Sequence, residues 1–280
     1  MAQNYEQAQL LQDAYLQHST EKLYEFFDNW AAAVRSNEKE APNPYVAEAH
    51  KVFAAFYQPL YTIDGSKHLA LYKHKPYFIV QSSLHEILQA EKIFSKPEEI
   101  DSFMVASIYR EFPNDTSLQN HWIKEVRSYK IGPAYDSYDF PRFARIPTTK
   151  LDSAIEFRPP VSFKGKKVVY LTQDYVELLD DFLNDTHIDL GEEDIMQPAY
   201  SSDNSQLRHE FFNKAALIFY GHWGGYWQYE TYPQAYKIIF NKEMDRAIVT
   251  FRFVYEGGKV ILEKQDGKWK IVDACFTWIE

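Results

Sequence analysis

The chain has 280 residues, a formal net charge of −10, and hydrophobic and charged fractions of 45% and 25%. This length allows one large domain or two smaller ones, each with a packed interior. Nucleic acids and anionic membrane surfaces require a basic surface, and no long cluster of Lys and Arg is present, so we expect neither as a partner. No apolar stretch approaches the length of a transmembrane helix.

The first residues carry neither the basic start nor the apolar run of a signal peptide. We therefore expect a soluble protein, either cytoplasmic or exported after removal of a leader. The single cysteine, Cys275, excludes an internal disulfide. A reducing compartment is consistent with this but is not required.

Aromatic residues make up 17% of the chain, with 21 Tyr, 20 Phe and 6 Trp. One interpretation is interior packing together with half-buried surfaces, where the ring is dry and the hydroxyl is solvated. The other is a stacking surface for sugar-like or aromatic ligands. We favour packing, because aromatic side chains commonly fill the faces of sheets.

The first part of the chain, from about residue 5 to residue 61, has a helical pattern. Apolar residues recur at three- and four-residue spacing and form one stripe: Leu16, Leu23, Phe26, Phe27, Trp30 and Val34. Ser19-Thr20 suits a helix start. Pro42 and Pro44 interrupt the pattern, and a second helix is predicted over residues 45–58. Asp64-Gly65 then indicates a turn.

Farther along, Tyr77–Val80 has the pattern of a buried strand, and Ser95–Glu99 that of a helix entry with proline early and acids in the first turn. Residues 132–160 contain several prolines among Tyr and Asp. We interpret this segment as a long surface connection and domain boundary, with edge strands broken by proline as the alternative.

After the boundary, residues 167–171 are predicted to form a strand. Thr172 or Asp174 would cap a helix that extends through Leu183, and residues 185–205 are polar and loop-like. The acidic segment 186–194 does not match the spacing of a calcium loop, and no phosphate loop or zinc motif is present. We therefore predict no metal and no cofactor.

The C-terminal part is predicted to be an antiparallel sheet with tight turns at Gly257-Gly258 and Asp266-Gly267, and a further loop at Lys242–Asp245. Counting alternate positions from these turns gives a charged face with an Arg252–Glu263–Lys270 ladder. The other face is apolar. Its members are Tyr236, Ile238, Phe240, Ala247, Val249, Phe251, Phe253, Tyr255, Val260, Leu262, Trp269 and Ile271.

Asp273 is the exception on the apolar face. The predicted register places it opposite Val260 and near Tyr255. A carboxylate there must find hydrogen-bond donors or have its pKa raised. It is a candidate for a pocket residue. The alternative is that the strand leaves the packed region and Asp273 is solvated.

An aromatic window at residues 219–233 extends this candidate site. If Gly224-Gly225 is a two-residue hairpin, His222 faces Trp227 and Tyr220 faces Tyr229. A turn at Pro233-Gln234 would then place these side chains on the face of Asp273. The candidate ligand-binding residues are His222, Trp227, Tyr229, Tyr236, Tyr255 and Asp273. The alternative is a packed aromatic hairpin with a hydrogen-bonded core histidine.

The order of helices followed by a curved antiparallel sheet, ending in "GGKVILEKQDGKWKIVD", resembles the nuclear-transport-factor-2-like (SnoaL-like) superfamily. The resemblance implies a bent sheet wrapped around helices as a cone, with a pocket at its wide end. Members include isomerases, dehydratases, cyclases and pure binding modules. The string beginning "YGHWGGYWQ" also resembles uncharacterised proteins of Bacteroidetes-type bacteria, which implies no activity.

We therefore expect an α+β fold, with a helix-rich part at residues 1–160 and a cone-like sheet domain at residues 161–280. The favoured function is a module that binds a small apolar or sugar-like molecule in an aromatic pocket. One alternative is an acid–base enzyme of isomerase, dehydratase or hydrolase type, with Asp273 as base and His222 or Tyr255 as acid or oxyanion donor. Another is a protein-interaction scaffold that forms a homodimer through aromatic surface.

Overall fold

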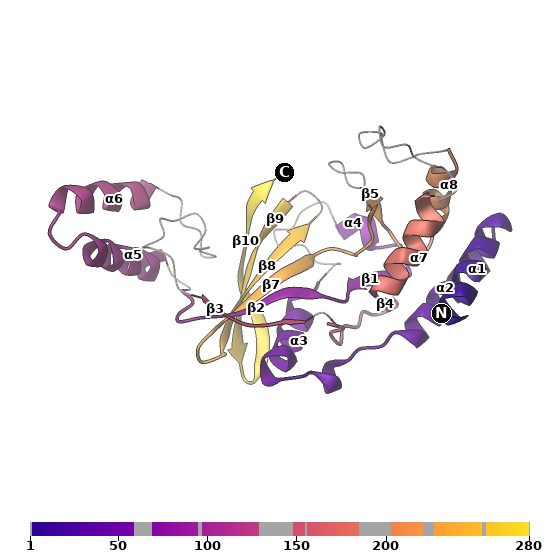
Figure 1. The fold of residues 1–280 in the computed structure, drawn as a ribbon, viewed down its shortest axis with the longest axis horizontal. Helices are drawn as coiled ribbons and strands as arrows, with labels where there is room; N and C mark the ends of the chain where they lie inside the picture. Colours follow the sequence, from indigo (N-terminus) through magenta and orange to yellow (C-terminus); the bar gives the residue numbers. More distant parts are fainter. Residues whose placement is uncertain are drawn as a thin grey trace.

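The computed structural model of the chain describes residues 2–58, 69–94, 97–128, 148–154, 156–184, 203–220, 227–253 and 256–279. The fold is α+β, with most helices in the N-terminal half and an antiparallel sheet in the C-terminal half that does not close into a barrel, so the predicted class is confirmed (Figure 1). The predicted turn at Asp64-Gly65 lies outside the described residues.

The helices are α1 Ala2–Leu16, α2 Thr20–Ala33, the short 3₁₀ helix η1 Glu38–Glu40, α3 Pro44–Phe56, α4 Leu69–Tyr72, α5 Pro97–Glu111, α6 Thr116–Ser128, α7 Gln173–Asn184 and α8 Asp203–Phe212. The strands are β1 Tyr77–Gln81, β2 Leu84–Ala90, β3 Thr148–Ala154, β4 Lys167–Leu171, β5 Phe219–Tyr220, β6 Trp227–Gln228, β7 Gln234–Asn241, β8 Arg246–Phe253, β9 Glu256–Gln265 and β10 Lys268–Ile279.

Local capping explains where the first helices begin. The Ser19 hydroxyl accepts a hydrogen bond from the Lys22 N–H at 3.2 Å, which confirms the predicted start of α2. The Asn43 side chain caps α3 in the same way, and Pro44 occupies the first position, where its missing N–H costs nothing. The apolar stripe of α2 is buried at Leu23, Phe26, Phe27 and Trp30.

Strands β1 and β4 form a parallel pair, with Tyr77 opposite Lys167 and Gln81 opposite Leu171. Both strands were predicted from the sequence. All side chains of β1 are buried because the pair lies between two cores. Phe78 and Val80 belong to the core that contains α3, while Tyr77 and Ile79 belong to the core formed by α1, α2, α7 and α8.

The larger sheet has six strands in the order β10-β9-β8-β7-β2-β3. Strands β7 to β10 are an antiparallel meander, and β2 joins it as a parallel neighbour of β7. The expected division at residue 160 therefore falls between strands that share this sheet. Strand β3 is an edge strand inside the segment 132–160, as the alternative interpretation of that segment proposed.

Helices α5 and α6 project from the sheet and pack on each other around Ile100, Met104, Ile108 and Val126 (Figure 1). The predicted entry of α5 at Ser95–Glu99 agrees with its first residue, Pro97. The predicted loop 185–205 overlaps α8, which begins at Asp203, and residues 185–202 lie outside the described part.

The turn at Asp266-Gly267 is confirmed, because Gln265 pairs with Lys268 and both turn residues have positive φ. The prediction of a turn at Gly257-Gly258 is wrong. Both glycines lie inside β9, where Gly257 pairs with Arg252. A Cβ atom on Gly258 would lie 2.1 Å from the backbone oxygen of Cys275 on β10. The glycine is therefore required by close strand approach and not by a bend.

The predicted apolar face is still correct, although the turn that was used to derive it is wrong. Val260 pairs with Val249 and not with the predicted partner Tyr255. The two partners are separated by an even number of positions in the chain, so the predicted face of each side chain is unchanged. The side chains buried against α3 on this face include Ile238, Phe240, Ala247, Val249, Phe251, Phe253, Val260, Leu262 and Trp269. Ile271 is 41% exposed and is an exception. The charged ladder is corrected, because Glu263 pairs with Arg246 at 3.2 Å and not with Arg252.

Candidate functional site

The aromatic pocket expected from the sequence depended on a hairpin at Gly224-Gly225, and that pairing is wrong. Tyr220 lies opposite Trp227 and not opposite Tyr229, and residues 221–226 between them lie outside the described residues. His222 and Tyr255 lie outside the described residues.

Trp227 and Tyr229 do lie in the same core, but they pack against helices and not in a pocket on the sheet. Both are buried in the core around α7 and α8. The Trp227 indole donates to the Asn184 side chain at 2.8 Å, and the Tyr229 hydroxyl donates to the Asp180 carboxylate. Burial raises the pKa of Asp180. This agrees with the packed aromatic interpretation.

Tyr236 and Asp273 belong to the six-stranded sheet. Tyr236 sits at an irregularity of β7, between the paired residues Ala235 and Lys237. On β10 the register shifts between Ile271 and Asp273, so Asp273 lies opposite Ile261 and not opposite Val260. The predicted register of Asp273 is therefore wrong, because an extra residue moves it to the other face. Its Oδ1 accepts the Ala274 N–H at 2.7 Å.

The structure holds a different concavity, a cleft of about 500 Å³ at the carboxyl ends of β1 and β4. Ser82 follows β1, and Thr172 follows β4 and leads into α7. Crevices outside the carboxyl ends of parallel strands are the usual place for ligands in open α/β arrangements. The cleft is lined by Ala33, Val34, Arg35, Ser82, Glu156, Arg158, Thr172, Gln173, Asp174 and Tyr175.

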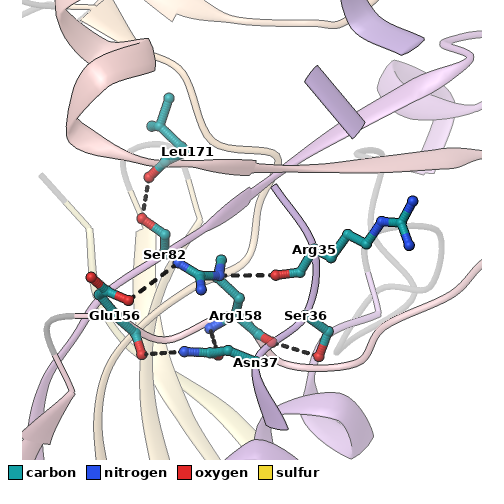
Figure 2. Close-up of polar contacts among 7 residues, drawn as sticks. All are labelled: Arg35, Ser36, Asn37, Ser82, Glu156, Arg158 and Leu171. Carbon is teal, nitrogen blue, oxygen red and sulfur yellow. Dashed lines mark hydrogen bonds and ion pairs between the residues drawn. The ribbon is translucent and has the colours of Figure 1, made fainter. Parts of the chain in front are cut away.

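One wall of the cleft is a clamp between residues 35–37, after α2, and residues 156–158 (Figure 2). The Asn37 side chain donates to the Glu156 carbonyl at 3.0 Å and accepts the Arg158 N–H at 2.9 Å. The Asn37 N–H donates to the Arg158 carbonyl at 3.1 Å, and the Ser36 hydroxyl donates to it at 2.8 Å. These bonds fix two segments that are distant in the sequence.

The clamp also orients the guanidinium group of Arg158. Its Nε donates to the Arg35 carbonyl at 2.9 Å, and Nη1 lies 3.5 Å from the Glu156 carboxylate. Figure 2 shows the guanidinium between these two acceptors, while the side chain of Arg35 extends away from them. The Arg158 side chain is 18% exposed and that of Glu156 is 75% exposed, so the cation is the more buried partner.

We expect Asn37→Ala to lower the free energy of unfolding by about 2 kcal/mol, because it removes two hydrogen bonds of a largely buried amide. Ser36→Ala is the matched control, since it removes one short bond, to the Arg158 carbonyl, and one long bond of 3.5 Å, from the Glu38 N–H, at an exposed position. Chemical denaturation of both variants measures the difference. Equal losses in the two variants would contradict the role of Asn37 as the centre of the clamp.

The opposite side of the cleft is the start of α7. The Tyr175 ring stacks on Trp30 with centroids 4.2 Å apart and an interplanar angle of 7°, and the Trp30 indole donates to the Tyr170 carbonyl at 3.0 Å. Tyr175 is 6% exposed, yet its hydroxyl has no hydrogen-bond partner among the residues described. Burial, followed by the charge of Asp174, raises the pKa of Tyr175 to about 12. The hydroxyl therefore remains a donor at physiological pH.

The sequence predicted the strands and the helix start that border this cleft, but it did not predict the cleft itself. Both strands and the helix start at Thr172 or Asp174 were predicted, and a strand followed directly by a capped helix was the available signal. The pairing of β1 with β4 across a long intervening segment has no local signature.

Within the described ranges, no group of three or more His, Cys, Asp and Glu side chains is placed to hold a metal ion. No helix of the described part is long and apolar enough to cross a bilayer. No protein-family model, curated protein or solved structure matches the chain.

Proposed function

We propose that the protein is a small-ligand-binding module and that its site is the cleft between the 35–37 and 156–158 clamp and the start of α7. The observation that carries the proposal is a cavity of about 500 Å³, a volume typical of small-molecule sites, at the carboxyl ends of a parallel strand pair. Its lining is mostly polar, which favours the sugar-like half of the expected ligand range over the apolar half.

Preorganisation supports this proposal. The main chain of one wall is fixed by the clamp, and the Ser82 hydroxyl is fixed by a hydrogen bond to the Leu171 carbonyl (Figure 2). Tyr175 is fixed by its stack on Trp30. A site whose groups are already held in place loses less conformational freedom when a ligand binds. The resemblance to the nuclear-transport-factor-2-like superfamily, which includes pure binding modules, remains a prediction that is compatible with this function.

A ligand-observed NMR screen tests the proposal with a panel of neutral sugars, sugar acids, sugar phosphates, amino acids and nucleosides. We expect at least one class to bind with a Kd of about 1 mM or tighter. Ala33→Trp should weaken that binding at least about tenfold, because the indole would fill the cleft that Ala33 lines.

Ala32→Trp is the matched control, because Ala32 is an exposed neighbour on α2 that does not line the cleft. It should bind like the wild type. A panel with no binder, or a binder that Ala33→Trp retains at full affinity, would contradict the proposal.

A further inference from the structure

The polar groups that line the cleft differ in burial, and the cation Arg35 is exposed together with the two carboxylates. The two carboxylates, Glu156 and Asp174, are on exposed residues, where solvent screens their charge. The less exposed side chains, in contrast, carry donors: Arg158, whose side chain is 18% exposed, and Tyr175, which is 6% exposed as a whole residue. The buried part of the cleft therefore favours a hydrogen-bond acceptor.

Arg158 and Tyr175 each have a donor that makes no hydrogen bond within the described ranges. Nε and Nη1 of Arg158 contact Arg35 and Glu156, but Nη2 has no hydrogen-bond partner within the described ranges. The Tyr175 hydroxyl also has none there. Neither atom is among the fully buried unpaired polar atoms of the described part, so both can donate to a ligand that enters the cleft. The stack on Trp30 prevents the Tyr175 ring from turning elsewhere.

The start of α7 adds donors at the same place. The helix has 12 residues and begins at Gln173. The Thr172 carbonyl accepts the N–H groups of Tyr175 and Val176, while the first N–H groups of a helix have no intrahelical acceptor. These groups and the helix dipole favour a negative charge.

We propose that the ligand carries an anionic group, a carboxylate or a phosphate monoester, which sits between Arg158, the Tyr175 hydroxyl and the first turn of α7. This inference rests on the proposed binding function and names the class of ligand. The anion would accept from Nη2 of Arg158, from Tyr175 and from the backbone N–H groups of Gln173 and Asp174. The remainder of the ligand would face the more exposed rim, where the two carboxylates can accept from its hydroxyl groups.

Isothermal titration calorimetry with glucose, gluconate and glucose phosphate tests the inference, because the three probes share a polyol and differ in the anionic group. We expect at least one of the anions to bind the wild type about ten times more tightly than glucose, as charge-assisted hydrogen bonds require. A preference for gluconate would identify the carboxylate as the recognised group, and a preference for glucose phosphate would identify the phosphate.

Tyr175→Phe is the most informative variant, because it removes only the unpartnered hydroxyl and keeps the stack on Trp30. It should fold with unchanged or higher stability and bind the anion about tenfold more weakly. Arg158→Gln should abolish the preference for the anions over glucose. Arg110→Gln, which removes the same charge from an exposed position on α5, should leave the preference intact.

Glucose binding as tightly as both anions would overturn the anionic class while leaving the cleft as a binding site. Tyr175→Phe binding the anion at full affinity would overturn the placement. Failure of all three probes to bind would overturn the inference, while the wider panel and Ala33→Trp decide the proposed function separately.

Discussion

Gly258→Ala is expected to destabilise the protein by about 3 kcal/mol, because the new methyl group has no space between β9 and β10. Its Cβ would lie 2.1 Å from the Cys275 oxygen and 2.9 Å from the Phe251 ring. The first contact is with backbone that is held in a sheet, so the two strands must separate locally. Thermal and chemical denaturation measure the loss.

Gly267→Ala is the control for this variant. Gly267 has a φ of +75° in the turn and nothing within 4 Å of an added Cβ. Alanine there should cost only the strain of positive φ, about 1 kcal/mol. If Gly258→Ala costs no more than Gly267→Ala, the placement of Gly258 inside β9 would be contradicted and a turn at Gly257-Gly258 would be favoured again.

The second large effect is a loss of stability in mild acid through His50. This side chain of α3 is fully buried against Phe157, with ring centroids 4.5 Å apart, and neither ring nitrogen has a hydrogen-bond partner in the described part. Burial, and to a smaller extent the charge of Arg158, lowers the pKa of His50 to about 4.

Proton linkage determines whether stability rises or falls with pH. Between the folded pKa of about 4 and the ordinary value of 6.5, the unfolded chain binds a proton at His50 that the folded protein does not. Stability therefore rises with pH across this window and is lost as the pH falls from 6.5 toward 4, by about 3 kcal/mol in total.

Denaturation of the wild type and of His50→Leu at several pH values in this window isolates the contribution, because all other titrating groups are shared. We expect the difference in unfolding free energy between the two proteins to shift in favour of His50→Leu as the pH falls. A difference that does not change with pH would show that His50 is solvated or paired in the folded protein.

The sequence predicted those features that have local causes. The cap at Ser19, the buried strand β1 and the turn at Asp266-Gly267 each depend on a few neighbouring residues. The apolar face of the meander was also predicted, because alternation depends only on whether a position is odd or even.

The errors in the predicted site have non-local causes. The pair Gly257-Gly258 is typical of a turn, but Gly258 is needed because β10 approaches β9 closely at this position. The extra residue before Asp273 leaves no compositional trace, yet it moves the residues from Asp273 to Phe276 to the opposite face, until a second register shift before Trp278. The cleft forms where β1 and β4 end side by side, and that pairing joins segments on either side of β2, β3, α5 and α6.

Backbone amide NMR during titration with glucose phosphate tests the location of the site most directly. We predict the largest shifts at Ser82, Gln173 and Asp174, around the cleft at the ends of β1 and β4. Shifts concentrated instead at Tyr236 and Asp273 on the six-stranded sheet, with none at the start of α7, would contradict it.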